Sequence, residues 1–338
     1  MVNLDKTYVI GTHVMWFEIE MYKDFLDGLV NLLTNIDEDS LYNVTVDICF
    51  NMSEVIEKID TDKTTTQQLE YKFNEMTELF WMKLGVKLKV NKRIIEKDEY
   101  YLHTDYRRDL NYNYCKKVDY VMWGETDSFF PREAFQVIET LAKYTDEQNI
   151  HKYLLSFSDR KMWDSSWDPL VHVDYRDHVF VDDENGHLNP NQAKSQMSIE
   201  EMNKINDKAK DFDFGMINHP KISGACLVLS SDLIKFGVNI PLCLLYNDDE
   251  GLSIMSQKLL GQNFKQFICT NVLHVHARRH PHKRMYVEGE DNPHSFINRK
   301  NSNFQKLLDF SKENIQKLIT GHGKFKDYND LKNELEMK

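Results

Sequence analysis

Short β-prone runs alternate with segments of helical apolar spacing through the first half of the chain, and this alternation limits the folds open to it. The expected strands are residues 7–10, 44–50, 86–90, 118–122 and 153–157. Helices are expected from Phe17, around 69–80 and from Pro131, and Gly11 is expected to interrupt the first strand. Such alternation is typical of a parallel sheet covered on both faces. The 338 residues, 41% of them hydrophobic, suffice for a core of this kind.

The regular alternation stops after the fifth expected strand. Residues 158–220 are polar and irregular, although Ser198 and Glu201 form a capping box for one short helix. Further on, strands are expected at 224–229, 267–270 and 272–276, and helices at 248–260, 302–319 and 328–337. We therefore expect one catalytic domain over residues 1–284, with an irregular lobe at 158–220. A C-terminal helical extension over 285–338 is expected to pack on it.

Charge and cysteine content exclude several broad classes. The net charge of −12 disfavours a protein that wraps nucleic acid, unless its basic residues are locally concentrated. Five cysteines without a CxxC pair indicate buried free thiols in a reducing compartment. No cationic and apolar leader and no run long enough to span a membrane occur in the sequence. A soluble cytoplasmic protein with no membrane contact is expected.

Two carboxylates follow the strand expected at 118–122. Glu125 and Asp127 flank Thr126, a spacing that lets both side chains reach one small region. Hard divalent cations such as Mg²⁺ or Mn²⁺ prefer carboxylate oxygens together with phosphate oxygens. The alternative is that Asp127 or Ser128 caps the following helix, and spacing alone favours that alternative.

A second acidic cluster, Asp248-Asp249-Glu250, stands at the start of an expected helix. Adjacent carboxylates repel one another, which can raise the pKa of one of them into the range of a general base. Capping of the helix and a favourable interaction with its dipole are the alternative.

Two histidines and a basic run follow. In a strand, His274 and His276 would point to the same face, where both could bind a metal ion. Arg278 and Arg279 begin a basic stretch that could neutralise a diphosphate or contact a polyanionic acceptor, the alternative being a solvated loop.

Aromatic side chains mark the irregular lobe. Trp163 and Trp167, with His172, either form the core of the lobe or provide a platform on which a sugar or base stacks.

The order of these motifs resembles a GT-A-type glycosyltransferase, broadly of the family 2 kind, over residues 5–280. The resemblance implies a Rossmann-type mixed sheet flanked by helices, with an irregular acceptor lobe. It implies that Asp127 and Glu125 hold the divalent metal and the nucleotide diphosphate. His274 or His276 would complete the metal shell, and Asp249 would be the catalytic base.

The resemblance also implies a nucleotide pocket. Thr12 and His13 would line it, and Asn51 stands where the family usually has an acidic residue. The implied activity is metal-dependent transfer, with Mn²⁺ or Mg²⁺, of a sugar from a nucleoside-diphosphate sugar to an acceptor hydroxyl, with inversion. The expected acceptor is a glycan or other hydroxyl compound, and the second choice is a hydroxymethylated base in viral DNA.

Two other functional classes remain open from sequence. A nucleotidyltransferase would share the sheet and the acidic metal ligands, but Gly11-Thr12-His13-Val14 offers no glycine-rich basic loop. A non-catalytic nucleotide-sugar-binding module would keep the fold without turnover.

Overall fold

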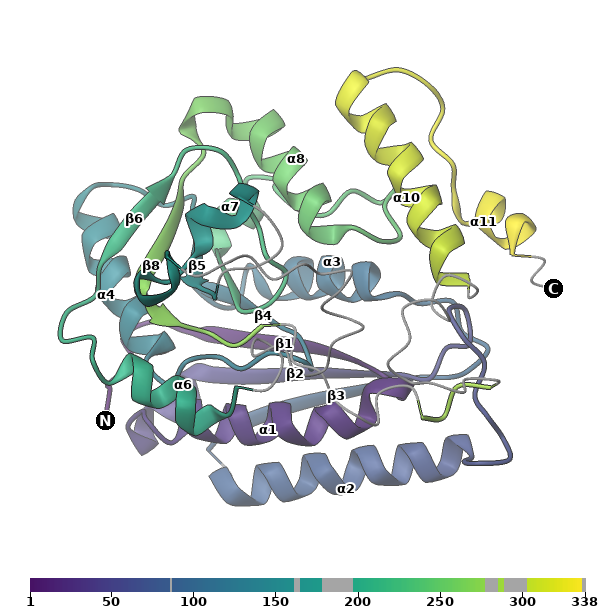
Figure 1. Ribbon diagram of the computed structural model, residues 1–338, viewed down its shortest axis with the longest axis horizontal. Helices are drawn as coiled ribbons and strands as arrows, with labels where there is room; N and C mark the ends of the chain where they lie inside the picture. The colour runs from purple at the N-terminus through teal and green to yellow at the C-terminus, as the bar shows by residue number, and fades with distance from the viewer. Residues whose placement is uncertain (86, 161–164, 178–196, 277–284, 289–302, 336–338) are drawn as a thin grey trace.

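A computed structural model describes residues 1–85, 87–160, 165–177, 197–276, 285–288 and 303–335. An eight-stranded mixed sheet forms its centre, with helices on both faces (Figure 1). The strands are β1 (Tyr8–Met15), β2 (Val44–Asn51), β3 (Lys89–Ile95), β4 (Tyr120–Gly124), β5 (Leu154–Ser158), β6 (Phe214–Ile217), β7 (Leu227–Ser230) and β8 (Gln266–Leu273). The helices are α1 (Ile19–Leu33), α2 (Thr66–Leu84), α3 (His103–Tyr114), α4 (Ala134–Glu147), α6 (Ile199–Asn206), α7 (Ser231–Lys235), α8 (Asp248–Leu260), α10 (Asn303–Thr320) and α11 (Tyr328–Glu334).

The strand order is β3-β2-β1-β4-β7-β5-β8-β6. Strands β3, β2, β1 and β4 are parallel, and β7 lies antiparallel between β4 and β5. Strand β8 is parallel to β5, and β6 closes the sheet as an antiparallel edge. Strands β1, β4, β5 and β8 therefore run in one direction, and their carboxyl ends meet along one edge. The expected α/β fold with a Rossmann-type mixed sheet is confirmed.

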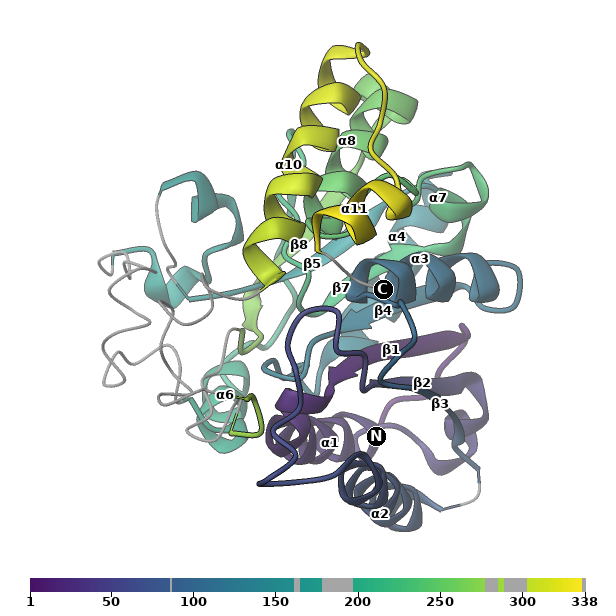
Figure 2. The same cartoon turned by 90° about the vertical axis from the view of Figure 1, so that its right-hand side faces the viewer.

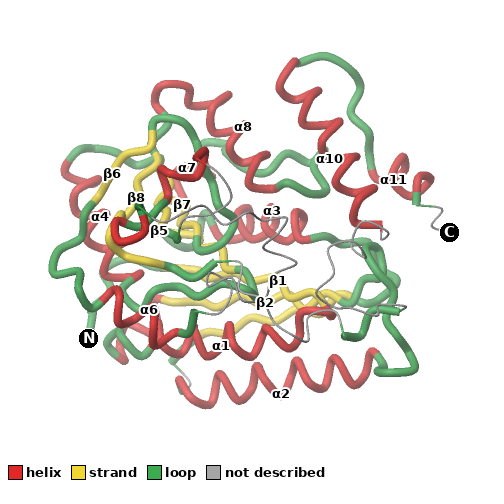
Figure 3. The backbone as a smooth tube through the Cα atoms, viewed as in Figure 1, coloured by secondary structure: helices red, strands yellow, loops and turns green. Residues whose placement is uncertain are grey.

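Each face of the sheet has its own apolar core. On β1, Tyr8 and Ile10 belong to the core shared with α1, α2 and α4, whereas Val9 packs with α3 and α7. This alternation follows from the pleat, which turns successive side chains to opposite faces. Figure 3 shows the resulting layers, with helices on both sides of the central strands.

Several element boundaries differ from the sequence predictions. Strand β1 continues through Gly11, and a Cβ at Gly11 would collide with the Leu110 side chain of α3 and lie 2.8 Å from the Tyr106 hydroxyl. Gly11 therefore admits a closely packed helix and does not end the strand. Strand β8 is one strand ending at Leu273, so the two predicted strands there are wrong. Beyond it, Val275 still pairs with Phe129 in an isolated bridge.

Helix termini follow local sequence signals. Helix α8 ends before Gly261 and α2 before Gly85, each glycine at positive φ, which glycine adopts readily at a helix end. The capping box of Ser198 and Glu201 begins α6, as predicted. Helix α4 begins at Ala134, three residues after Pro131.

The C-terminal helices pack on the sheet domain. Figures 1 and 2 both show α10 alongside α8. Leu307 and Phe310 of α10 are buried in the main core. In the irregular lobe, β6 joins the central sheet, so the described part of the lobe is continuous with the domain.

All five cysteines are free thiols. Among the described residues, no helix combines the length and apolar character needed to cross a membrane.

Candidate functional site

A cavity of about 610 Å³ opens at the carboxyl ends of β1 and β4. One part of its wall is apolar and is lined by Met15, Phe17, Ile56, Tyr246 and Phe304. Another part is charged and is lined by Glu18, Arg107, Glu125, Asp127, Asp248, Asp249 and His276. Strand order reverses between β1 and β4, because the chain adds β2 on one side of β1 and β4 on the other. Open α/β sheets bind their ligands at such switch points.

Arg107 on α3 joins two of the acidic segments. Its guanidinium donates to Asp248, to Glu125 Oε1 at 2.8 Å and to the Gly224 carbonyl at 2.7 Å. Only 2% of the Arg107 side chain is exposed. Burial opposes ionisation of Glu125 and Asp248, but the charge of Arg107 outweighs it and lowers the pKa of both carboxyl groups. Both are therefore carboxylates with a fixed counterion.

Asp249 has a different environment. Burial, together with the neighbouring Asp248 charge, raises the pKa of Asp249 to about 7. The chain enters α8 through Asn247 at φ 60°, a left-handed conformation that asparagine tolerates. This turn brings both Asp248 and Asp249, in the first turn of α8, to the cavity wall. A carboxyl group with a pKa near neutrality suits a general base.

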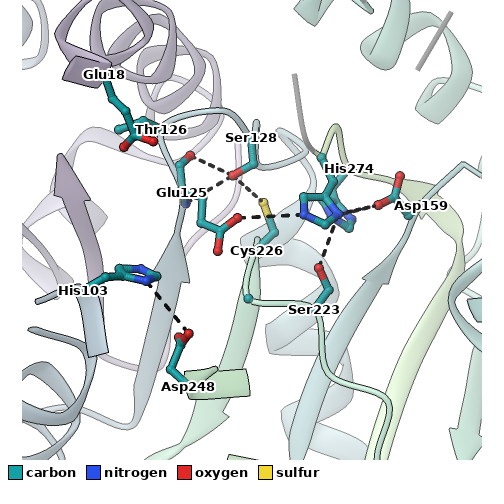
Figure 4. Close-up of polar contacts among 12 residues, drawn as sticks. Glu18, His103, Glu125, Thr126, Ser128, Asp159, Ser223, Cys226, Asp248 and His274 are labelled. Atoms are coloured by element: carbon teal, nitrogen blue, oxygen red, sulfur yellow. Dashed lines mark hydrogen bonds and ion pairs between the residues drawn. The ribbon is translucent and has the colours of Figure 1, made fainter. Parts of the chain in front are cut away.

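A third group lies at the ends of β5 and β8. Asp159, His274 and His276 each offer a ligand atom, and these atoms lie within 4.8 Å of one another. His276 Nδ1 is 3.1 Å from Asp159 Oδ2, and His276 Nε2 is 3.8 Å from Glu125 Oε2. Figure 4 shows Glu125 between this group and the pair formed by His103 and Asp248. The group could hold a metal ion.

The ring of His274 is oriented as in a metal ligand. Its Nδ1 lies 3.0 Å from the Ser158 carbonyl oxygen, so Nδ1 carries the proton and donates it. Burial lowers the pKa of His274, which keeps the ring neutral and Nε2 unprotonated. Among the described residues this buried Nε2 has no hydrogen-bond partner, and it lies 3.7 Å from Asp159 Oδ2. Two lone-pair donors that face each other fit a cation between them.

The chemistry of this donor set discriminates between the two expected metals. Two imidazoles and one carboxylate suit Mn²⁺ and other transition metals, whereas Mg²⁺ prefers oxygen ligands. The donor set therefore fits a transition metal better than Mg²⁺.

His276 connects this group to the acidic wall. Burial opposes its charged form, but the hydrogen bond with Asp159 and the charges of Glu125 and Asp127 raise the pKa of His276 to about 9. Asp127 and His276, predicted to converge, line the same cavity.

The turn after β4 is held by Ser128. Its hydroxyl accepts from the Glu125 amide at 3.2 Å and donates to the Glu125 carbonyl at 2.8 Å. The N-cap residue of α4 is Glu133, and no side chain makes a capping hydrogen bond there. The alternative that Asp127 or Ser128 caps this helix is therefore wrong.

The structure brings together many of the predicted site residues. The cavity is lined by His13, Glu125, Asp127, Trp167, Asp248, Asp249 and His276. His274 lies next to it, within the Asp159 group. Glu125, predicted to bind metal and nucleotide, is held by Arg107 and also lies beside His276, and Asp159 joins the two histidines.

Other predicted residues do not line the cavity, although Asn51 contacts His13, which does. Thr12 and Asn51 are buried, and the Asn51 amide donates to the Tyr101 carbonyl at 2.7 Å. His172 is buried and its Nδ1 accepts from the Asp174 amide, whereas Glu250 is exposed. Thr12 and Asn51 differ from the sequence prediction because they are packed in strands β1 and β2. Glu250 differs because its position on α8 faces outward. Trp163, Arg278 and Arg279 lie outside the described residues.

Sequence reasoning missed Arg107, His103 and Asp159. The first two lie on α3, whose only strong helical signal is the spacing of Tyr106 and Leu110. Asp159 lies two residues after the strand expected at 153–157, and that position was its available signal.

No protein-family model and no curated protein matches the chain. Among solved structures, the chain is similar to glucosyl-3-phosphoglycerate synthase of M. tuberculosis. The identity is 12% and the TM-score 0.38, over 82% of this chain and 73% of that chain.

Proposed function

We propose that this protein is a metal-dependent glycosyltransferase that moves a sugar from a nucleoside-diphosphate sugar to an acceptor hydroxyl. The observation that carries the proposal is the position of Asp249, a carboxyl group with a pKa of about 7, on the same cavity wall as Asp127 and His276. A base and a candidate metal group thus share one cavity at a ligand-binding edge of the sheet.

In the proposed reaction, Asp249 accepts the proton of the acceptor hydroxyl. The oxygen attacks the anomeric carbon, a new glycosidic bond forms, and the bond from that carbon to the diphosphate oxygen breaks. The electron pair leaves with the nucleoside diphosphate. A single displacement of this kind inverts the anomeric centre.

Asp159, His274 and His276 would hold the metal ion, with Asp127 beside them. A bound Mn²⁺ would supply positive charge to the diphosphate. Glu125 and Asp248, held by Arg107, shape the wall between the candidate metal group and the base.

The acceptor is proposed to enter from the irregular lobe. Trp167 lines the cavity from this side, and the Lys221 ammonium lies 4.0 Å from its ring centroid. An indole face of this kind packs against the apolar face of a sugar ring.

The proposal is tested in two steps. Nucleoside-diphosphate sugars are screened by thermal shift with Mn²⁺ and with chelator, and release of nucleoside diphosphate is then measured. One donor should stabilise the protein only with Mn²⁺. D249N should keep this shift and lose release, whereas the control E250Q, at an exposed neighbouring carboxylate, should keep both.

Two results would contradict the proposal. One is the lack of any Mn²⁺-dependent stabilisation by every nucleoside-diphosphate sugar tested. The other is full release by D249N. Donor stabilisation without release by the wild-type protein would indicate a binding module.

A further inference from the structure

We propose that Arg107 is a positioning residue for Asp249: it ties Asp248 at the start of α8 to Glu125 at the end of β4, and so fixes the first turn of α8, which carries the base. This inference rests on the proposed function, because it assigns Asp249 the role of base. It adds a residue from α3, a helix that supplies none of the acidic groups of the site.

The contacts of Arg107 reach three separate segments. One terminal nitrogen donates to Asp248, and the other donates to Glu125 and to the Gly224 carbonyl. The two carboxylates are 123 positions apart in the sequence, so their spacing depends on tertiary contacts, and Arg107 supplies one that touches both. The planar guanidinium fork fixes distance and angle together, which a lysine ammonium cannot do.

The surroundings are shaped for this guanidinium. Its plane lies over the Trp123 ring, with the carbon atom 4.7 Å from the ring centroid. The Trp123 indole donates to Asn111 of α3 at 2.9 Å, so β4 and α3 are fixed to each other on both sides of Arg107. A Cβ at Gly224 would collide with Arg107 and lie 2.7 Å from Glu125 Oε1. A glycine there permits the close approach.

The charges that face Asp249 come from three elements. Asp248 on its own helix and Glu125 at the end of β4 raise its pKa, whereas Arg107 of α3 lowers it. His103 of α3 lies 3.9 Å from Asp248, and burial keeps this ring toward its neutral form by lowering its pKa. Among these described groups around Asp249, Arg107 therefore carries the permanent positive charge, and the others are negative or neutral.

Removal of this charge has a defined consequence. In R107M, Glu125 and Asp248 lose their counterion, and the three carboxyl groups compete for protons. Of the three carboxyl groups, Asp249 has the highest pKa. Loss of the Arg107 charge should raise the pKa of Asp249 further.

The first experiment compares the pH profiles of kcat/KM for wild type, R107M, R107K and R107M/D248N. The acid limb should move up by about one pH unit in R107M, since one nearby opposite charge has this effect on a carboxyl group. R107M/D248N removes the unpaired charge and should return the limb toward wild type. R107K keeps the charge without the fork, so its limb should stay while kcat falls.

A merely structural role gives a different result. It would lower the melting temperature of R107M while the folded protein kept the wild-type acid limb, and that result would overturn the inference. If R107M does not fold, R107K decides: an unchanged acid limb together with an unchanged kcat in R107K would overturn the inference.

A second measurement needs no activity. The pH dependence of the unfolding free energy, taken as the difference between D249N and its parent, reports the titration of Asp249 in the folded state. The midpoint should move up when the parent is R107M instead of wild type. A shifted midpoint of the Asp249 titration without any donor turnover would support the role of Arg107 and refute the proposed function. An unshifted midpoint would refute the role of Arg107.

Discussion

Ionisation of Asp249 should cost the protein stability, and D249N should remove that cost. The folded-state pKa is about 7, against 3.8 in the reference state. Between these values the folded protein holds a proton that the unfolded chain has lost. The unfolding free energy therefore falls as pH rises from about 4 to about 7, and is level above that range.

The magnitude follows from the shift. About three pKa units at about 1.4 kcal/mol each give a limit of about 4 kcal/mol. Asp249 keeps partial exposure, so we expect about half of this, roughly 2 kcal/mol, after solvent screening. D249N should match wild type near about pH 3, where Asp249 is protonated in both the folded and the unfolded protein, and exceed it by this amount near about pH 8.5.

Urea unfolding followed by circular dichroism at a series of pH values measures the effect. The other titrating groups cancel in the difference between variant and wild type. E250Q changes an exposed carboxylate in the same helical turn and should give a flat difference. A difference between D249N and wild type that is constant across this range would refute the raised pKa and, with it, the reason for choosing Asp249 as base.

Three further outcomes are expected. H274A should abolish the stabilisation by Mn²⁺, about 2.7 kcal/mol at one hundred times the Kd, whereas H151A, at an exposed histidine, should keep it. Equal Mn²⁺-induced shifts of the melting temperature in H274A and H151A would exclude His274 as a ligand. G224A should lower the unfolding free energy by about 1–3 kcal/mol in urea, because its Cβ displaces Arg107, and an unchanged value would show that the guanidinium moves freely. W167A should raise the KM of the acceptor about tenfold, or roughly 1.4 kcal/mol, with an unchanged donor shift; a selective loss of donor binding would place Trp167 in the donor site instead.

Most of the central strands could be predicted from the sequence because they are buried and rich in apolar residues. Residues 44–50 and 153–157 show this signal, and both correspond to strands. Helix α3 gave little signal, since most of its residues are polar and several of those are buried in contacts with other segments. Arg107 is the clearest case. A fully enclosed arginine looks in the sequence like any solvated one, because its partners lie far along the chain.

The candidate metal group shows the same limit. His274 and His276 were recognised from local spacing, which does not depend on the fold. Asp159 joins them only because β5 pairs with β8, which places position 158 opposite 273. A sequence pattern shows which segments are strands, but the pairing of distant strands depends on packing over the whole sheet. The third member of the group could therefore not be predicted.

The charge balance of the cavity bears on how a donor would bind. Its described lining carries the carboxyl groups of Glu18, Glu125, Asp127, Asp248 and Asp249. Among the described lining residues, Arg107 is the one side chain with a permanent positive charge. That charge is already shared by Glu125 and Asp248. A diphosphate entering alone would meet a net negative wall, and the repulsion would be large where water is excluded. A divalent cation reduces that negative charge and places a positive centre where the diphosphate would bind, so metal and donor should each increase the affinity of the protein for the other by the same factor. Such reciprocity explains how an acidic cavity can be suited to an acidic ligand.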